Sequence, residues 1–148
     1  MAELTRKEII MAINGSERPR LAGVDLSNEN CSRLDLENAN MRGANIRATN
    51  LREAILRSAN MTGVNAVGVN LQFADLNAAI CVAADFTVAN LQGARLTGAD
   101  LTNANVSGAN LQGANLKSAK VQGMRFDAGT RWPDGKQGLS VNPNDYTV

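Results

Sequence analysis

Four arginines stand five residues apart in the stretch RGANIRATNLREAILR: Arg42, Arg47, Arg52 and Arg57. Guanidinium groups bind phosphate oxygens through paired hydrogen bonds, so a row of them could hold a nucleic-acid backbone. Neither standard element aligns this spacing, because a five-residue step turns about 140° on a helix and changes face on a strand. The interpretation of the arginines therefore depends on how a five-residue period folds.

The chain offers few other groups for chemistry. It contains no histidine, which removes the commonest general base and the commonest metal ligand. Cys31 and Cys81 are far apart in the sequence, and we expect them to be small buried hydrophobic residues rather than redox groups. We find no nucleophile beside a base, no metal-ligand cluster and no phosphate-binding glycine loop. The sequence therefore predicts a protein that is not an enzyme and needs no cofactor.

Length and composition suit one domain with a narrow core. The 148 residues are 44% hydrophobic but only 3% aromatic, so the interior must be built mainly from small aliphatic side chains. A net charge of +1 gives no field strong enough to indicate a polyanionic partner. The start, MAELTRKEII, lacks a secretory signal pattern, and no apolar run reaches transmembrane length. We expect a cytoplasmic protein without a membrane partner, unless a signal was trimmed from the sequence.

A five-residue repeat runs through most of the chain. From Leu21 to Phe126 every fifth residue is apolar, and a small residue, usually Ala, stands two positions before it. Asn or Asp usually lies between the two, as in GANLQGANLKSA. The consensus is A-(N/D)-L-x-x, and a repeat of this kind indicates a solenoid.

This pattern resembles the repeat of the pentapeptide-repeat family over residues 21–126. The resemblance implies an all-β fold, a right-handed quadrilateral β-helix in which four pentapeptides form the four sides of a square coil. The central residue and the small residue before it would point inward, and the other three positions would face water. The repeats would make about 5.5 coils.

The charges of the repeat test the four-sided coil independently. If a coil takes twenty residues, side chains twenty apart stack at the strand spacing of about 4.8 Å. Opposite charges on neighbouring strands stabilise a sheet, and like charges destabilise it. Four charged pairs have this separation, and all four are opposite in sign: Arg33 with Glu53, Glu37 with Arg57, Asp75 with Arg95, and Asp100 with Lys120. The pairs favour the square coil.

Stacking by twenty also aligns amide side chains along one side of the coil. Such ladders can bond up and down the stack, and we interpret them as structural rather than as a ligand site. The ladder residues are Asn30, Asn50, Asn70, Asn90 and Asn110, with Gln72, Gln92 and Gln112.

Two inward positions depart from the repeat. Ala66 replaces a large central residue, and Val64 and Val69 beside it are expected to restore the missing volume. Glu29 occupies a small-residue position with Thr49 stacked on it. Because an isolated buried carboxylate is costly, Glu29 should hydrogen-bond Thr49 or open toward the end of the coil.

Several apolar residues stand at positions expected to face water. Adjacent exposed apolar residues suggest a contact surface, although plain strand propensity is the alternative explanation. The possible protein interface consists of Val67, Phe73, Ile80, Val82 and Val88.

The two ends need caps, because an open solenoid exposes its core and unpaired strand edges. Residues 1–20 are predicted to form an N-terminal capping helix and a linker, with a capping box from Thr5 to Glu8. Residues 127–148 are predicted to form a C-terminal cap, in which Trp132 covers the last coil, followed by a loosely attached tail. The stretch TRWPDG resembles the closures of many cyanobacterial and chloroplast-related pentapeptide-repeat proteins.

The leading functional hypothesis is a non-enzymatic scaffold for a protein partner that the sequence does not identify, a homodimer being one form. By family analogy, an alternative is a DNA mimic that regulates topoisomerase, although those relatives use a strongly negative rod and this second coil is positive. A third hypothesis is weak nucleic-acid binding through the arginines. In a square coil, however, Arg42, Arg47, Arg52 and Arg57 form a belt that points in four directions. We therefore do not expect nucleic acid as the partner.

Overall fold

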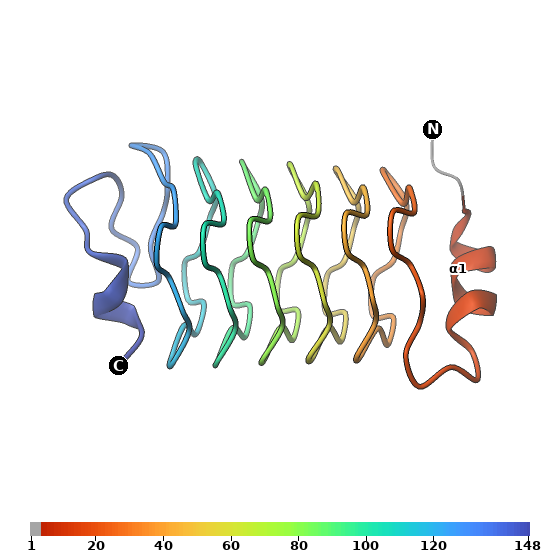
Figure 1. Cartoon of the computed structure of the whole chain (residues 1–148). Helices are drawn as coiled ribbons and strands as arrows, with labels where there is room; N and C mark the ends of the chain where they lie inside the picture. The colour runs from red at the N-terminus through yellow and green to blue at the C-terminus, as the bar shows by residue number, and fades with distance from the viewer. Residues whose placement is uncertain (1–3) are drawn as a thin grey trace.

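One α-helix, α1 (Arg6–Ile13), is found among residues 4–148, the part of the chain that the computed structural model describes. Its capping box is as predicted: the Glu8 backbone N–H donates to the Thr5 hydroxyl, and the Thr5 backbone N–H donates to the Glu8 carboxylate at 2.8 Å. The Thr5 backbone N–H and the Thr5 hydroxyl both donate to the Glu8 carboxylate, which lowers the pKa of Glu8. The helix lies across the N-terminal end of the coils (Figure 1). The first three residues of the predicted N-terminal unit, 1–20, lie outside the described residues.

The repeats form a right-handed quadrilateral β-helix with stacked turns (Figure 1). Parallel bridges join residues twenty apart, from Arg20 with Asn40 to Asn105 with Arg125. Each side of a coil contributes one bridged residue, and a turn follows it. Four pentapeptides therefore make one turn of the solenoid, as the charge pattern predicts.

Backbone hydrogen bonding explains the Asn or Asp of the repeat. In a typical repeat, four of the five backbone N–H groups donate to backbone carbonyls of the same or an adjacent coil. The fifth donates to the side-chain oxygen of the Asn or Asp two positions earlier, as from Gln92 to Asn90 at 3.2 Å. The short polar side chain thus satisfies a donor that the coil leaves over.

The predicted amide ladder is aligned, but most of its asparagines bond within their own repeat. Asn30 to Asn110 are bridged in register at intervals of twenty. Bonds along the axis join Gln72 to Gln92 at 3.2 Å and Asn50 to Asn30 at 3.4 Å. The competing donor is a backbone N–H of the same turn, which donates to the Asn side-chain oxygen.

The interior is narrow and continuous, because the central residues and the small residues before them are almost fully buried. Ala66, Val64 and Val69 all lie inside, at 0–1% exposure. Cys31 and Cys81 are free and buried, and burial raises the pKa of their thiols to about 11 and about 12. Thiols with so high a pKa are unreactive at neutral pH, which agrees with a packing role.

Glu29 does not bond Thr49 and is not fully buried. The Thr49 hydroxyl donates instead to the Leu26 carbonyl at 2.7 Å, and the Glu29 residue is only half-buried. The carboxylate stays in contact with water, which avoids the cost of an isolated buried charge.

All four charged pairs predicted from the sequence are ion pairs in the structure. The closest approaches are 2.8 Å for Arg33 with Glu53, 2.8 Å for Arg57 with Glu37, 3.4 Å for Lys120 with Asp100, and 3.9 Å for Arg95 with Asp75. Arg57 also reaches Asp75 at 3.6 Å, so two of the pairs join into one network.

The C-terminal cap continues the stack after one inserted residue. Arg131 bridges Asn110, twenty-one positions earlier, and Trp132 is fully buried beyond the last repeats. The Trp132 indole N–H donates to the Gly138 carbonyl at 3.0 Å, and Phe126 packs edge-on against the ring, with centroids 5.0 Å apart. The prediction that Trp132 covers the last coil is confirmed.

The expectation of a loosely attached tail is wrong. A short 3-10 helix, η1 (Pro143–Tyr146), folds back on the cap, and the Tyr146 ring stacks on Trp132. The Ser118 backbone N–H donates to the Thr147 carbonyl at 2.7 Å. The tail thus pairs with an edge of the solenoid that would otherwise be open. No helix among the described residues is long and apolar enough to cross a membrane.

Candidate interaction surfaces

Among the described residues, two arginines of the belt form ion pairs and two do not. Arg52 contacts Glu53 at 3.1 Å and donates to Gln72, and Arg57 contacts Glu37 and Asp75. No ion pair to Arg42 or Arg47 occurs within residues 4–148. These two free guanidinium groups belong to successive turns of one coil, so the structure does not gather the belt into a single patch.

The five predicted interface residues also spread over several turns. The turn that contains Val67 stacks on the turn that contains Val88. Val82 lies in the turn before that of Val88, and Phe73 lies in the turn after that of Val67. Phe73 is 50% exposed, Ile80 is 41% exposed and Val88 is 59% exposed. Val67 and Val82 are half-buried.

Phe73 and Val88 hold an unusual backbone conformation. The last residue of each turn has a positive φ, and in nine of the twenty-one turns from residue 23 to residue 123 it is Gly. Phe73 has a φ of 57° and Val88 a φ of 51°. Positive φ disfavours bulky residues and above all β-branched ones. The sequence signal was present, because both residues occupy the position where Gly recurs, but only the coil register reveals its conformational meaning.

Each of these two side chains covers a glycine of the next coil. A Cβ atom placed on Gly93 would lie 2.5 Å from the Phe73 ring, and one on Gly108 would lie 3.0 Å from Val88 Cγ1. The Arg52 guanidinium lies over the Phe73 ring, 5.1 Å from its centroid. Gly93 therefore provides the space in which the exposed ring rests.

Phe73 and Val88 flank one side of the solenoid. Residues 89–92 connect the turn of Val88 to the turn of Gly93, which the Phe73 ring covers. Asn90 lies between them, in register with the other asparagines of the ladder. We call the surface formed by Phe73, Val88 and Asn90 the flanked side. It is an amide surface bounded by two exposed apolar groups.

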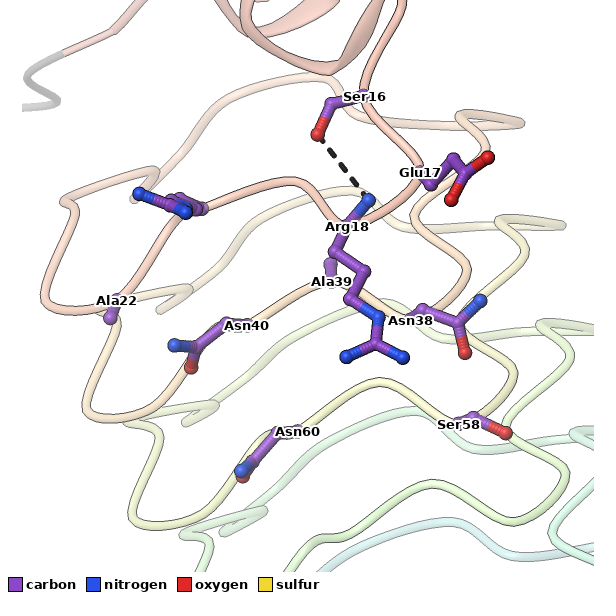
Figure 2. Close-up of a pocket in the computed structure, with 10 residues that line it drawn as sticks. Ser16, Glu17, Arg18, Ala22, Asn38, Ala39, Asn40, Ser58 and Asn60 are labelled. Atoms are coloured by element: carbon purple, nitrogen blue, oxygen red, sulfur yellow. Dashed lines mark hydrogen bonds between the residues drawn. The ribbon is translucent and has the colours of Figure 1, made fainter.

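A groove of about 880 Å³ lies beside the linker that follows α1 (Figure 2). The linker contributes Arg18 and Arg20, and the neighbouring coils contribute Asn40 and Asn60. In Figure 2 the Arg18 side chain extends over the coils beside Asn38, while the Glu17 carboxylate points away from it. Reasoning from the repeat missed this groove, because the linker lies outside the periodic part of the sequence.

Groups of three or more His, Cys, Asp or Glu side chains that could hold a metal ion do not occur within residues 4–148. The surfaces of the protein are instead a set of stacked turns, ion pairs and amides on a rigid coil. Such an arrangement defines a class of solenoid protein whose coil is built from four five-residue repeats.

Comparison with known families agrees with that class. A family model described as pentapeptide repeats matches residues 20–52, 44–80 and 79–117, and the chain belongs to this family. A search of curated proteins finds no significant match.

Solved structures of pentapeptide repeat proteins resemble the chain. Rfr23 from the cyanobacterium Cyanothece 51142 is 26% identical, with a TM-score of 0.79 over 86% of this chain and 99% of that protein. HetL from Nostoc sp. strain PCC 7120 is 28% identical over 80% of this chain and 72% of that one, with a TM-score of 0.33. A pentapeptide repeat protein of the Arabidopsis thaliana thylakoid lumen is 30% identical over 71% and 69%, with a TM-score of 0.38.

Proposed function

We propose that this protein is a non-enzymatic scaffold that binds a protein partner through its flanked side. The observation that supports this proposal is the pair of exposed apolar residues, Phe73 and Val88, held at positive φ. Each combines an unfavourable backbone conformation with apolar surface left in water. Gly or Asn would relieve both costs, as Asn does in the turns at Asn28, Asn38 and Asn103.

A binding role accounts for both costs together. Strained residues concentrate at functional sites, where the rest of the fold holds them in place. The ring of Phe73 is fixed between Arg52 and Gly93, so it would enter an interface without losing much conformational freedom. Aromatic side chains held in this way are typical anchors of protein interfaces.

The test compares two double variants in affinity capture from the native cell. Phe73→Asn with Val88→Asn removes both anchors and keeps residues suited to positive φ. Ala78→Asn with Ala83→Asn is the matched control, because both alanines are exposed at positive φ in other turns. A partner retained by the wild type and by the control but lost from the Phe73/Val88 variant supports the proposal. Equal retention by all three proteins contradicts it.

Light scattering identifies the case in which the partner is a second copy of the chain. A dimer of the wild type that becomes monomeric only in the Phe73/Val88 variant would make the flanked side a homodimer interface. A monomeric wild type would exclude a second copy of the chain as the partner.

A further inference from the structure

The groove beside the linker has a floor of hydrogen-bond donors. The Asn40 side-chain oxygen accepts from the Arg42 backbone N–H at 3.3 Å, and the Asn60 oxygen accepts from the Thr62 backbone N–H at 3.1 Å. The oxygen of each carboxamide is therefore occupied, and its amino group remains to meet a ligand. Asn40 and Asn60 are bridged neighbours, so the two residues stack at the strand spacing of about 4.8 Å.

The walls of the groove carry positive charge. Within residues 4–148, Arg18 and Arg20 form no ion pair, whereas four arginines of the repeat do. Glu17 also lines the groove, but Figure 2 shows its carboxylate turned away from the Arg18 guanidinium. Two unneutralised guanidinium groups above stacked amide donors form a surface suited to oxyanions.

We infer that this groove binds the carboxylate side chains of an acidic, extended segment of a protein partner. The inference rests on the proposed scaffold function and adds a second, electrostatic contact to it. The volume of about 880 Å³ is large enough for several residues rather than one small ion. Carboxylates spaced along the segment would accept hydrogen bonds from Arg18, Arg20 and the amino groups of Asn40 and Asn60.

The charge distribution favours an acidic peptide over a nucleic acid. Duplex binding needs many phosphate contacts along a continuous basic track. Two of the nearby arginines, Arg52 and Arg57, are held by carboxylates, and the chain has a net charge of only +1. Other arginines without ion pairs among the described residues, such as Arg47 and Arg125, stand in different coils and form no continuous basic track, whereas Arg18 and Arg20 line the same groove.

The test is a titration of the full chain with an acetylated hexaglutamate peptide at low salt, observed by 15N NMR and by fluorescence anisotropy of a labelled peptide. Arg18→Gln with Arg20→Gln should raise the Kd at least fivefold. Arg47→Gln with Arg125→Gln is the matched control, because it removes two exposed arginines without ion pairs from outside the groove. The control should change the Kd less than twofold, and the side-chain amide signals of Asn40 and Asn60 should shift in the wild type.

Three results would overturn the inference. The first is an equal loss of affinity in both variants, which would mean unspecific attraction to charge. The second is the absence of shifts at Asn40 and Asn60. The third is tighter binding of inorganic phosphate or a short DNA duplex than of the peptide, with the same dependence on Arg18 and Arg20, which would assign the groove to phosphate.

The proposed scaffold function and the groove inference can be tested independently of each other. The Phe73→Asn, Val88→Asn variant should bind hexaglutamate as the wild type does, because its substitutions lie outside the groove. A failed titration alongside successful partner discrimination by that variant would remove only the groove inference.

Discussion

The ring of Tyr146 lies parallel to the indole of Trp132, with centroids 5.8 Å apart and 7° between the ring planes. This contact ties the last residues of the chain to the buried cap. Tyr146→Ala should lower the free energy of unfolding by about 1 to 2 kcal/mol, because it removes a stacked pair and uncovers the cap. Denaturant unfolding followed by the fluorescence of Trp132, the only tryptophan, measures the loss. Leu139→Ala is the control, since Leu139 is 66% exposed and should tolerate the change.

Stability should depend on alkaline pH through the same tyrosine. Burial, and then the hydrogen bond that its hydroxyl donates to Asp134 at 2.9 Å, raise the pKa of Tyr146 to about 12. The unfolded value is about 10, so this contribution to stability is complete below pH 10 and is lost as the pH rises through 12. Phenolate absorbance reports the titration directly, because Tyr146 is the only tyrosine. Tyr146→Phe should remove this part of the pH dependence, and a titration near pH 10 in the folded protein would contradict the prediction.

The sequence predicts the repeat region in detail because a single five-residue period sets the register of every coil. A shift of one residue would turn each central Leu outward, so the inside and outside pattern specifies the pairing. The ion pair of Arg33 with Glu53 follows from that register alone, since both lie at the same position of stacked coils. The role of Asn90 does not follow in the same way, because alignment permits either an axial amide bond or the bond to its own turn.

The structure of the segments outside the repeat could not be predicted from the five-residue period. Trp132 takes its place only after one extra residue enters the last coil, and the pattern does not specify where a coil admits an insertion. The groove depends on how the linker carrying Arg18 leaves the coil, which nonlocal packing decides. The strain at Val88 becomes visible only when the last residue of each turn is known to have a positive φ.

The network of Glu37, Arg57 and Asp75 should give a small stabilisation that depends on salt. Arg57 is 2.8 Å from Glu37 and 3.6 Å from Asp75 and remains partly exposed, so water and ions screen the attraction. Arg57→Gln should lower the thermal midpoint at low salt, and high salt should reduce the difference from the wild type. Arg47→Gln is the matched control, because Arg47 has no ion pair among the described residues. An effect of Arg57→Gln that does not change with salt would show that packing, not charge, is responsible.

Position 66 should accept only a small side chain, because Val64 and Val69 occupy the space around it. Ala66 is fully buried beside Val64 and Val69, so a larger side chain has to displace well-packed groups. Ala66→Leu should lower the free energy of unfolding by about 1 to 3 kcal/mol, as measured by urea denaturation. Val67→Leu adds a methylene next to it on the half-buried outer surface and should have little effect. Stabilisation by Ala66→Leu would instead reveal unfilled space in this layer.

Val88→Asn should make the isolated protein more stable while it weakens partner binding. Val88 is β-branched, has a φ of 51° and is 59% exposed, so its replacement removes strain and loses little burial. Asn adopts positive φ readily, as at Asn103 with a φ of 58°, and the gain should be about 0.5 to 1 kcal/mol. Val67→Asn in the stacked turn is the control, because Val67 is half-buried and does not have a positive φ, so it should give no gain. A lower stability of Val88→Asn in urea denaturation would show that packing of Val88 over Gly108 outweighs the strain, and the case for a retained binding residue would lose its basis.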